Sequence, residues 1–164
     1  MLLGTIELCN ALECHQKVTM VASSAADLVA QASSVSSSDM NDVFNASSAI
    51  IYPFAQGNIS IVISSVLSDG AGNGTVDWSV ANANGKKLNT GDPITLTQPL
   101  MSTCDADGTC TPCDKGKCIV ILTQVTYNYT SPIGKYFVGS VPMKDYFFER
   151  PRKSTTVACN ACGG

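Results

Sequence analysis

Eight cysteines are the residues of this 164-residue chain most able to carry chemistry. Four of them lie between Cys104 and Cys118, spaced C-x5-C-x2-C-x4-C. Four converging thiolates would form a tetrahedral zinc site, and Cys110 and Cys113 have a spacing that suits two of the ligands. The other spacings are irregular for a zinc ribbon. Two disulfides that staple a long loop are therefore the favoured interpretation, with a secreted zinc-binding module as the alternative.

A second cysteine pair, Cys159 and Cys162, has the C-x-x-C spacing of thiol redox motifs. In such motifs a helix that begins at the cysteines lowers the thiol pKa. Only two residues follow Cys162, so we expect the motif to open no helix of its own. A local disulfide, or a bridge back to Cys104, is the simpler prediction in an oxidising compartment. The disulfide candidates are Cys104, Cys110, Cys113, Cys118, Cys159 and Cys162.

The sequence contains none of the residue patterns typical of common enzyme active sites. His15 is the only histidine, so a Cys-His or Ser-His-Asp arrangement would depend on it, yet it lies within a predicted helix. Asp105 and Asp107 resemble the start of a calcium loop, but Gly116 occupies the position that requires Glu. Phosphate-binding glycine loops, dinucleotide fingerprints and His-Glu-x-x-His motifs do not occur. We therefore predict a non-enzymatic protein with no catalytic residues and no cofactor.

Composition and charge narrow the classes of partner. The chain carries a net charge of −3, and charged residues make up only 14% of it. Its one basic cluster, at residues 150–153, is too short to follow a nucleic acid backbone. A hydrophobic fraction of 45% over 164 residues supports one domain with its own core. We therefore predict no nucleic acid partner and no small-molecule substrate.

A long helix is predicted over residues 3–32. Apolar residues recur there at three- or four-residue steps, and Ala22, Ala26 and Ala30 add a side of small residues. Small residues allow neighbouring helices to approach closely, although the pattern is equally compatible with an ordinary core helix. The residues predicted to pack this helix are Val18, Val21, Ala22, Ala25, Leu28 and Val29.

A second, shorter helix is predicted from Asp39 to Ile51, with Asp39 as its N-cap. The rest of the chain alternates apolar and polar residues between turn signals, a pattern typical of antiparallel strands. Strands are expected near residues 59–66, 76–80, 94–97, 118–129, 141–149 and 153–159. The predicted fold is therefore α+β, with two helices packed on an antiparallel sheet. The long helix occupies residues 1–32, and a disulfide-stapled head with the Cys-rich loop 104–118 occupies residues 33–164.

Short motifs spread over most of the chain resemble those of one bacterial family. A Gly-x-x-Glu precedes the Ala-rich helix, a Trp-Ser pair and a Tyr-x-Tyr strand with a following proline come later, and an Arg-Pro-Arg lies near the C-terminus. In their order and spacing they resemble the TadE/TadG-like pilus assembly proteins, the pseudopilins or minor pilins of bacterial tight-adherence (Flp) pili. The motif residues are Gly4, Glu7, Trp78, Tyr127, Tyr129, Pro132, Arg150 and Arg152.

This resemblance implies a structural or assembly role in surface attachment rather than catalysis. The family joins a membrane-derived, pilin-like helix to a globular head, and the helix packs against other subunits. The implied partners are other pilin or pilus assembly subunits, and the inner membrane through a helix upstream of Met1. The implied location is the bacterial inner membrane with a periplasmic or extracellular head, or the pilus surface.

The chain departs from the family pattern in two places. Residues 1–12 are apolar but interrupted by Glu7, whereas a membrane span needs about 20 apolar residues. We therefore expect this chain to lack the family's leader and most of its membrane helix. The second departure is the dense cysteine loop, because one or two cysteines are expected in the family.

Overall fold

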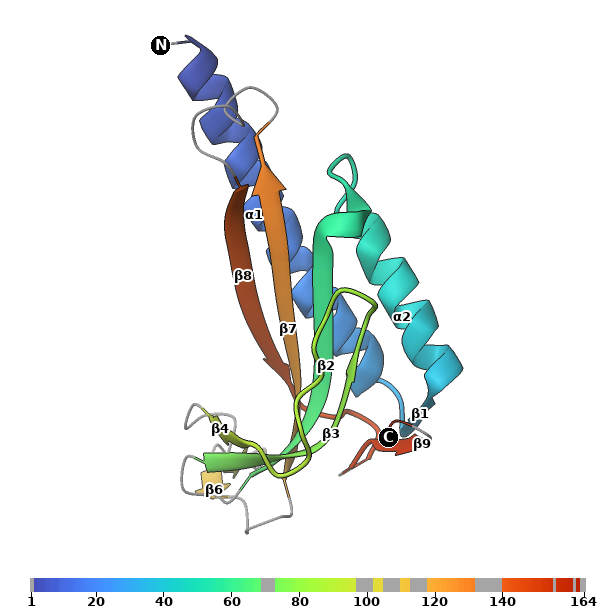
Figure 1. The fold of residues 1–164 in the computed structure, drawn as a ribbon. Helices are drawn as coiled ribbons and strands as arrows, with labels where there is room; N and C mark the ends of the chain where they lie inside the picture. The colour runs from blue at the N-terminus through green and yellow to red at the C-terminus, as the bar shows by residue number, and fades with distance from the viewer. Residues whose placement is uncertain are drawn as a thin grey trace.

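The structure is a computed structural model with two α-helices and a curled antiparallel sheet, which confirms the predicted α+β class (Figure 1). It describes residues 2–68, 73–96, 102–104, 110–112, 118–131, 140–154, 156–160 and 162. The helices are α1 (Leu2–Ala30) and α2 (Ser37–Ile50), and a short 3-10 turn covers Gln56–Asn58. The strands are β1 (Ser34–Ser36), β2 (Ile59–Ser68), β3 (Asn73–Ala81), β4 (Pro93–Thr95), β5 (Ser102–Cys104), β6 (Cys110–Pro112), β7 (Ile119–Thr130), β8 (Ser140–Glu149) and β9 (Ala158–Asn160).

The main sheet has the strand order β4-β3-β2-β7-β8, and every neighbouring pair in it is antiparallel. The alternating isoleucines of β2 and the long apolar run of β7 pair directly, with Ile59 opposite Tyr127 and Ile61 opposite Val125. A register shift follows Ser65, where β3 bends relative to β2. These two strands therefore form the centre of the main sheet.

Both helices contribute to a single core on one face of the sheet. α1 lies against β7 and β8, and α2 packs beside α1. Alternation along the strands directs one set of apolar side chains toward the helices. The sheet residues of this core are Ile59, Ile61, Ile63, Trp78, Ile119, Ile121, Val125, Tyr127, Tyr129 and Met143. A smaller cluster of Val66, Leu96 and Leu122 forms a separate core.

The start of α2 differs from the sequence prediction. Ser36, not Asp39, is the N-cap, and its hydroxyl accepts a hydrogen bond from the Asp39 backbone N–H at 3.3 Å. The Asp39 carboxylate in turn accepts from the Ser36 N–H at 2.8 Å, which completes a capping box. Asp39 therefore acts from the third helical position. Met40, Phe44 and Ser47 form the buried face, as the apolar spacing predicts.

The serine-rich segment after α1 contains a strand that the sequence did not reveal. Residues 34–36 form β1, which pairs in parallel with β9 near the C-terminus. The last strand was expected from residue 153 but covers only Ala158–Asn160. β1 and β9 make a separate two-stranded sheet at the end of the molecule where α1 stops and α2 begins.

Candidate functional site

The second half of α1 is buried against the sheet of its own chain. Val18, Val21, Ala22, Ala25 and Val29 are at most 1% exposed. Their small size lets the helix approach β7 and β8 closely. These residues therefore pack the helix inside the head, and burial withdraws them from contact with another subunit. The sequence left open whether this face packs against other subunits or against the chain's own core, and the burial of these side chains favours the core.

Leu28 was predicted on the same face as the buried residues, but it is 44% exposed. Val29, which was also predicted to pack the helix, is buried, so the helix face runs through residues 18, 21, 22, 25, 26 and 29. A step of three from Val18 to Val21 and of four from Ala25 to Val29 keeps this face aligned. Leu28 lies one residue to the side.

The first part of α1 presents apolar side chains to solvent. Figure 1 shows its N-terminal turns extending beyond the ends of β7 and β8. Leu2 is 76% exposed, Leu8 61% and Leu12 56%, and Ile6 is exposed as well. A Cβ atom at position 4, where the chain has Gly4, would have no neighbouring atom within 4 Å. We call Leu2, Ile6, Leu8 and Leu12 the apolar projection; the apolar run at residues 1–12 was its signal in the sequence.

Two polar contacts attach α1 to the head near its ends. Near the N-terminus, the Ser131 hydroxyl donates a hydrogen bond to the Glu7 carboxylate, so this motif residue joins the helix to the end of β7. At the other end, the Arg152 guanidinium lies 2.7 Å from the Asp27 carboxylate. The Arg152 backbone N–H also donates to the Ala30 carbonyl at 2.9 Å, which caps the last turn of α1.

The remaining motif residues have mainly structural positions. The Trp78 indole N–H donates to the Val157 carbonyl at 2.8 Å, and both residues are buried. Arg150 is half-buried between β8 and the C-terminal segment. Pro132 lies outside the described residues.

Cys14 is fully buried within the core that includes Tyr127 and Tyr129. Burial, with the Glu13 charge as a smaller cause, raises the pKa of the Cys14 thiol to about 11. Burial likewise raises the pKa of both tyrosines. The Cys14 thiol is therefore neutral at physiological pH, which makes it a packing residue rather than a nucleophile.

Three of the six candidate cysteines are disulfide-bonded in the structure: Cys118, Cys159 and Cys162. Cys159 and Cys162 form a disulfide with their Cα atoms 5.4 Å apart. Cys118 is also disulfide-bonded, and the backbone of the β5–β6 pair sets Cys104 opposite Cys110. Cys113 lies outside the described residues. A disulfide sulfur is not a thiolate ligand, so the pairing of Cys118 argues against the four-cysteine zinc site.

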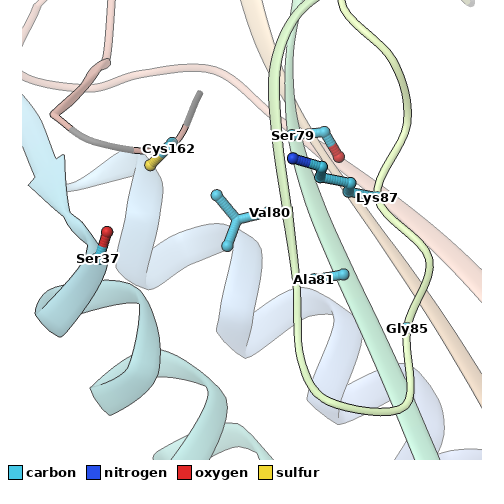
Figure 2. A pocket seen from close by; sticks show the side chains of 7 residues that line it. All are labelled: Ser37, Ser79, Val80, Ala81, Gly85, Lys87 and Cys162. Carbon is cyan, nitrogen blue, oxygen red and sulfur yellow. The ribbon is translucent and has the colours of Figure 1, made fainter. Parts of the chain in front are cut away.

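Two adjoining cavities lie beside the Cys159–Cys162 disulfide. The larger has a volume of about 260 Å³ and is lined by residues that include Ser37, Ser79, Lys87 and Cys162 (Figure 2). The smaller, of about 170 Å³, shares Ser79, Lys87 and Cys162 and extends along Asp77 of β3. No cluster of three or more His, Cys, Asp or Glu side chains suited to a metal ion occurs among the described residues.

No protein-family model, curated protein or solved structure matches this chain. None of the helices that the structure describes is both long and apolar enough to cross a membrane.

Proposed function

We propose that this protein is a structural subunit, a minor pilin or pseudopilin, of a bacterial tight-adherence pilus. The observation that carries the proposal is the division of α1 into two parts. The second part is buried in the head, whereas the first extends beyond the sheet with apolar side chains exposed. A helix built in this way joins a folded head to neighbouring helices, as the resemblance to TadE/TadG-like proteins implies.

The apolar projection supplies the driving force for such packing. Burial of one leucine or isoleucine side chain stabilises a complex by roughly 1.5–3 kcal/mol, before the cost of association. Four such side chains lie within three turns of α1, and Gly4 among them leaves room for a second helix to approach. Partner subunits that present similar helices would cover these side chains.

The attachment of α1 to the head supports a mechanical role. The contact between Glu7 and Ser131 and that between Arg152 and Asp27 hold the helix near its two ends. Between them, the helix is continuous with the hydrophobic core. Force applied to the projecting part would therefore pass into the sheet. The upstream membrane helix of the family would extend this same α1 into the inner membrane, with the head in the periplasm or on the pilus surface.

The direct test is a count of surface pili by electron microscopy in a strain that lacks only this gene. Pili should be lost, and a wild-type copy of the gene should restore them. Unchanged pilus number and length in the deletion strain would remove the assembly role.

Complementation of the deletion strain with variants tests whether the apolar projection itself is needed for pilus assembly. Leu8→Gln combined with Leu12→Gln keeps good helix formers but removes apolar surface, so pilus number should stay low. Leu28→Gln, at an exposed site outside the projection, is the matched control and should restore pili. Equal restoration by both variants would show that the projection has no part in assembly.

A further inference from the structure

The Cys159–Cys162 disulfide lies at the N-terminus of α2. The parallel pairing of β1 with β9 sets Ser36 opposite Asn160. Ser36 is the N-cap of α2, and Ser37 is its first helical residue. Ser37 and Cys162 line the same cavity, and in Figure 2 the Cys162 sulfur points toward the first turn of the helix. The C-x-x-C motif thus adjoins a helix N-terminus that a distant part of the chain supplies.

This position favours the thiolate form of a reduced cysteine pair. The N-terminus of a helix carries roughly half a positive elementary charge, and α2 is 14 residues long. Lys87 lines both cavities beside Cys162 and contributes a positively charged side chain to their lining. Among the described residues of the two cavities and the capping box, the acids are Asp77 in the smaller cavity and Asp39 in the capping box. The Ser36 N–H and hydroxyl donate to the Asp39 carboxylate at 2.8 and 2.7 Å, which offsets part of its charge.

The disulfide is also open to an incoming thiol. Cys159 and Cys162 are both half-buried, and Cys162 contributes to the lining of both cavities. Together the cavities form a depression along β3 and residues 85–90. A purely structural disulfide would need no such access. A disulfide whose reduced form is stabilised is, in addition, a stronger oxidant.

We propose that Cys159 and Cys162 form a redox-active disulfide that oxidises a pair of cysteine thiols on a peptide segment. A substrate thiolate attacks the Cys162 sulfur, the Cys159–Cys162 bond breaks, and Cys159 leaves as a thiolate that takes up the proton lost by the substrate. The second substrate thiol loses its proton and attacks the mixed disulfide, which releases Cys162 as a thiolate. Two electrons pass from the substrate thiols to the cysteine pair, one proton ends on Cys159, and the second proton passes to solvent while Cys162 remains a thiolate. This activity does not depend on the proposed role in a pilus.

A redox titration of the intact protein tests the proposal. The folded protein is equilibrated in glutathione buffers, its thiols are blocked, and tryptic peptides are analysed by mass spectrometry. Cleavage after Lys153 isolates Cys159 and Cys162 in residues 154–164, and cleavage after Lys117 isolates Cys118 in residues 118–135. The Cys118 disulfide is therefore an internal reference. Half-reduction of the Cys159–Cys162 pair should require at least tenfold less reductant than that of Cys118. An equal or greater requirement would overturn the proposal.

Two lysine variants test the local electrostatics. Lys87→Gln removes a positive charge from the cavities, so half-reduction should require roughly two- to fivefold more reductant. Lys86→Gln changes the neighbouring exposed lysine, which lines neither cavity, and should leave the midpoint unchanged. Equal shifts of the half-reduction point in the two variants would show that Lys87 has no specific effect on the disulfide.

Stoichiometric oxidation of a synthetic peptide with two cysteines tests the reaction itself. Under anaerobic conditions, one peptide disulfide should form for each protein molecule, and residues 154–164 should become reduced at the same time. Peptide thiols that stay reduced while the Cys159–Cys162 disulfide remains intact would overturn the proposal.

Discussion

Burial of the Cys14 side chain determines whether its thiol ionises. Both Cys9 and Cys14 are free thiols in α1, but Cys9 is exposed whereas Cys14 is buried. Burial raises the pKa of Cys14 from 9.0 to about 11. The folded state therefore favours the neutral thiol, and its contribution to stability is complete below pH 9. It is lost as the pH rises toward 11, because the unfolded thiol ionises first.

We expect the free energy of unfolding to fall by up to about 1.4 kcal/mol per pH unit between pH 9 and 11 on account of Cys14. Urea denaturation over this pH range measures the slope. In Cys14→Ala the slope should be shallower by this amount, while the contributions of Tyr127 and Tyr129 remain. Identical slopes in the two proteins would show that Cys14 is not held neutral by the fold.

Trp78 illustrates a residue whose polar atom matters as much as its size. Its indole N–H pairs with the buried Val157 carbonyl, which attaches the C-terminal segment to β3. Trp78→Phe removes the donor and should cost about 1–3 kcal/mol of stability, because the carbonyl is left without this partner. Thermal or urea unfolding followed by circular dichroism measures the loss. Tyr52→Phe, at an exposed aromatic site, should change stability by less than about 0.5 kcal/mol.

At the scale of the elements, the small residues of α1 set the distance between helix and sheet. Ala22, Ala25 and Ala26 are fully buried where the helix crosses the head. Ala25→Leu should therefore push the helix away from the sheet and cost about 1–3 kcal/mol in urea denaturation. Ala46→Leu makes the same change at an exposed position of α2 and should be nearly neutral. A similar loss in both variants would mean that leucine itself, rather than overpacking, is the cause.

The two helices and the strands of the main sheet were predictable because they rest on local signals, whereas β1, β5 and β6 were missed. Helical spacing identified both helices, and alternation in β2 and the long apolar run of β7 identified the central strands. The pairing of β1 with β9 was missed because it joins distant residues, and Ser34 to Ser36 carry no strand pattern. The same pairing brings α2 to the C-x-x-C motif, so the neighbourhood of Cys162 could not be read from residues near it in sequence.

The apolar spacing in the sequence also does not determine which part of a protein packs against a helix face. It placed Val18, Val21 and Ala25 together, but their contact with the chain's own sheet is a property of the tertiary structure. The apolar residues before Cys14 gave an ambiguous signal, because an apolar run at the start of a chain fits either a buried core or an exposed interface. Only the extension of α1 beyond β7 and β8 shows that these side chains are exposed.

At the scale of the whole molecule, the two halves of α1 have separate roles. The half from Cys14 onward belongs to the core, whereas the apolar projection contributes little to it. Stability and self-association should therefore respond to different substitutions. This separation follows from the pattern of burial alone and can be measured in purified protein.

A triple variant, Ile6→Gln with Leu8→Gln and Leu12→Gln, tests this separation. Its free energy of unfolding in urea should stay within about 1 kcal/mol of the parent, because these side chains are already exposed. Sedimentation velocity should show less self-association, because the apolar surface available for contact is smaller. Val18→Gln places an amide in the core and should cost several times more stability, about 2–5 kcal/mol. A triple variant that unfolds as readily as Val18→Gln would make the projection part of the folded head, and undiminished self-association would move the contact surface elsewhere.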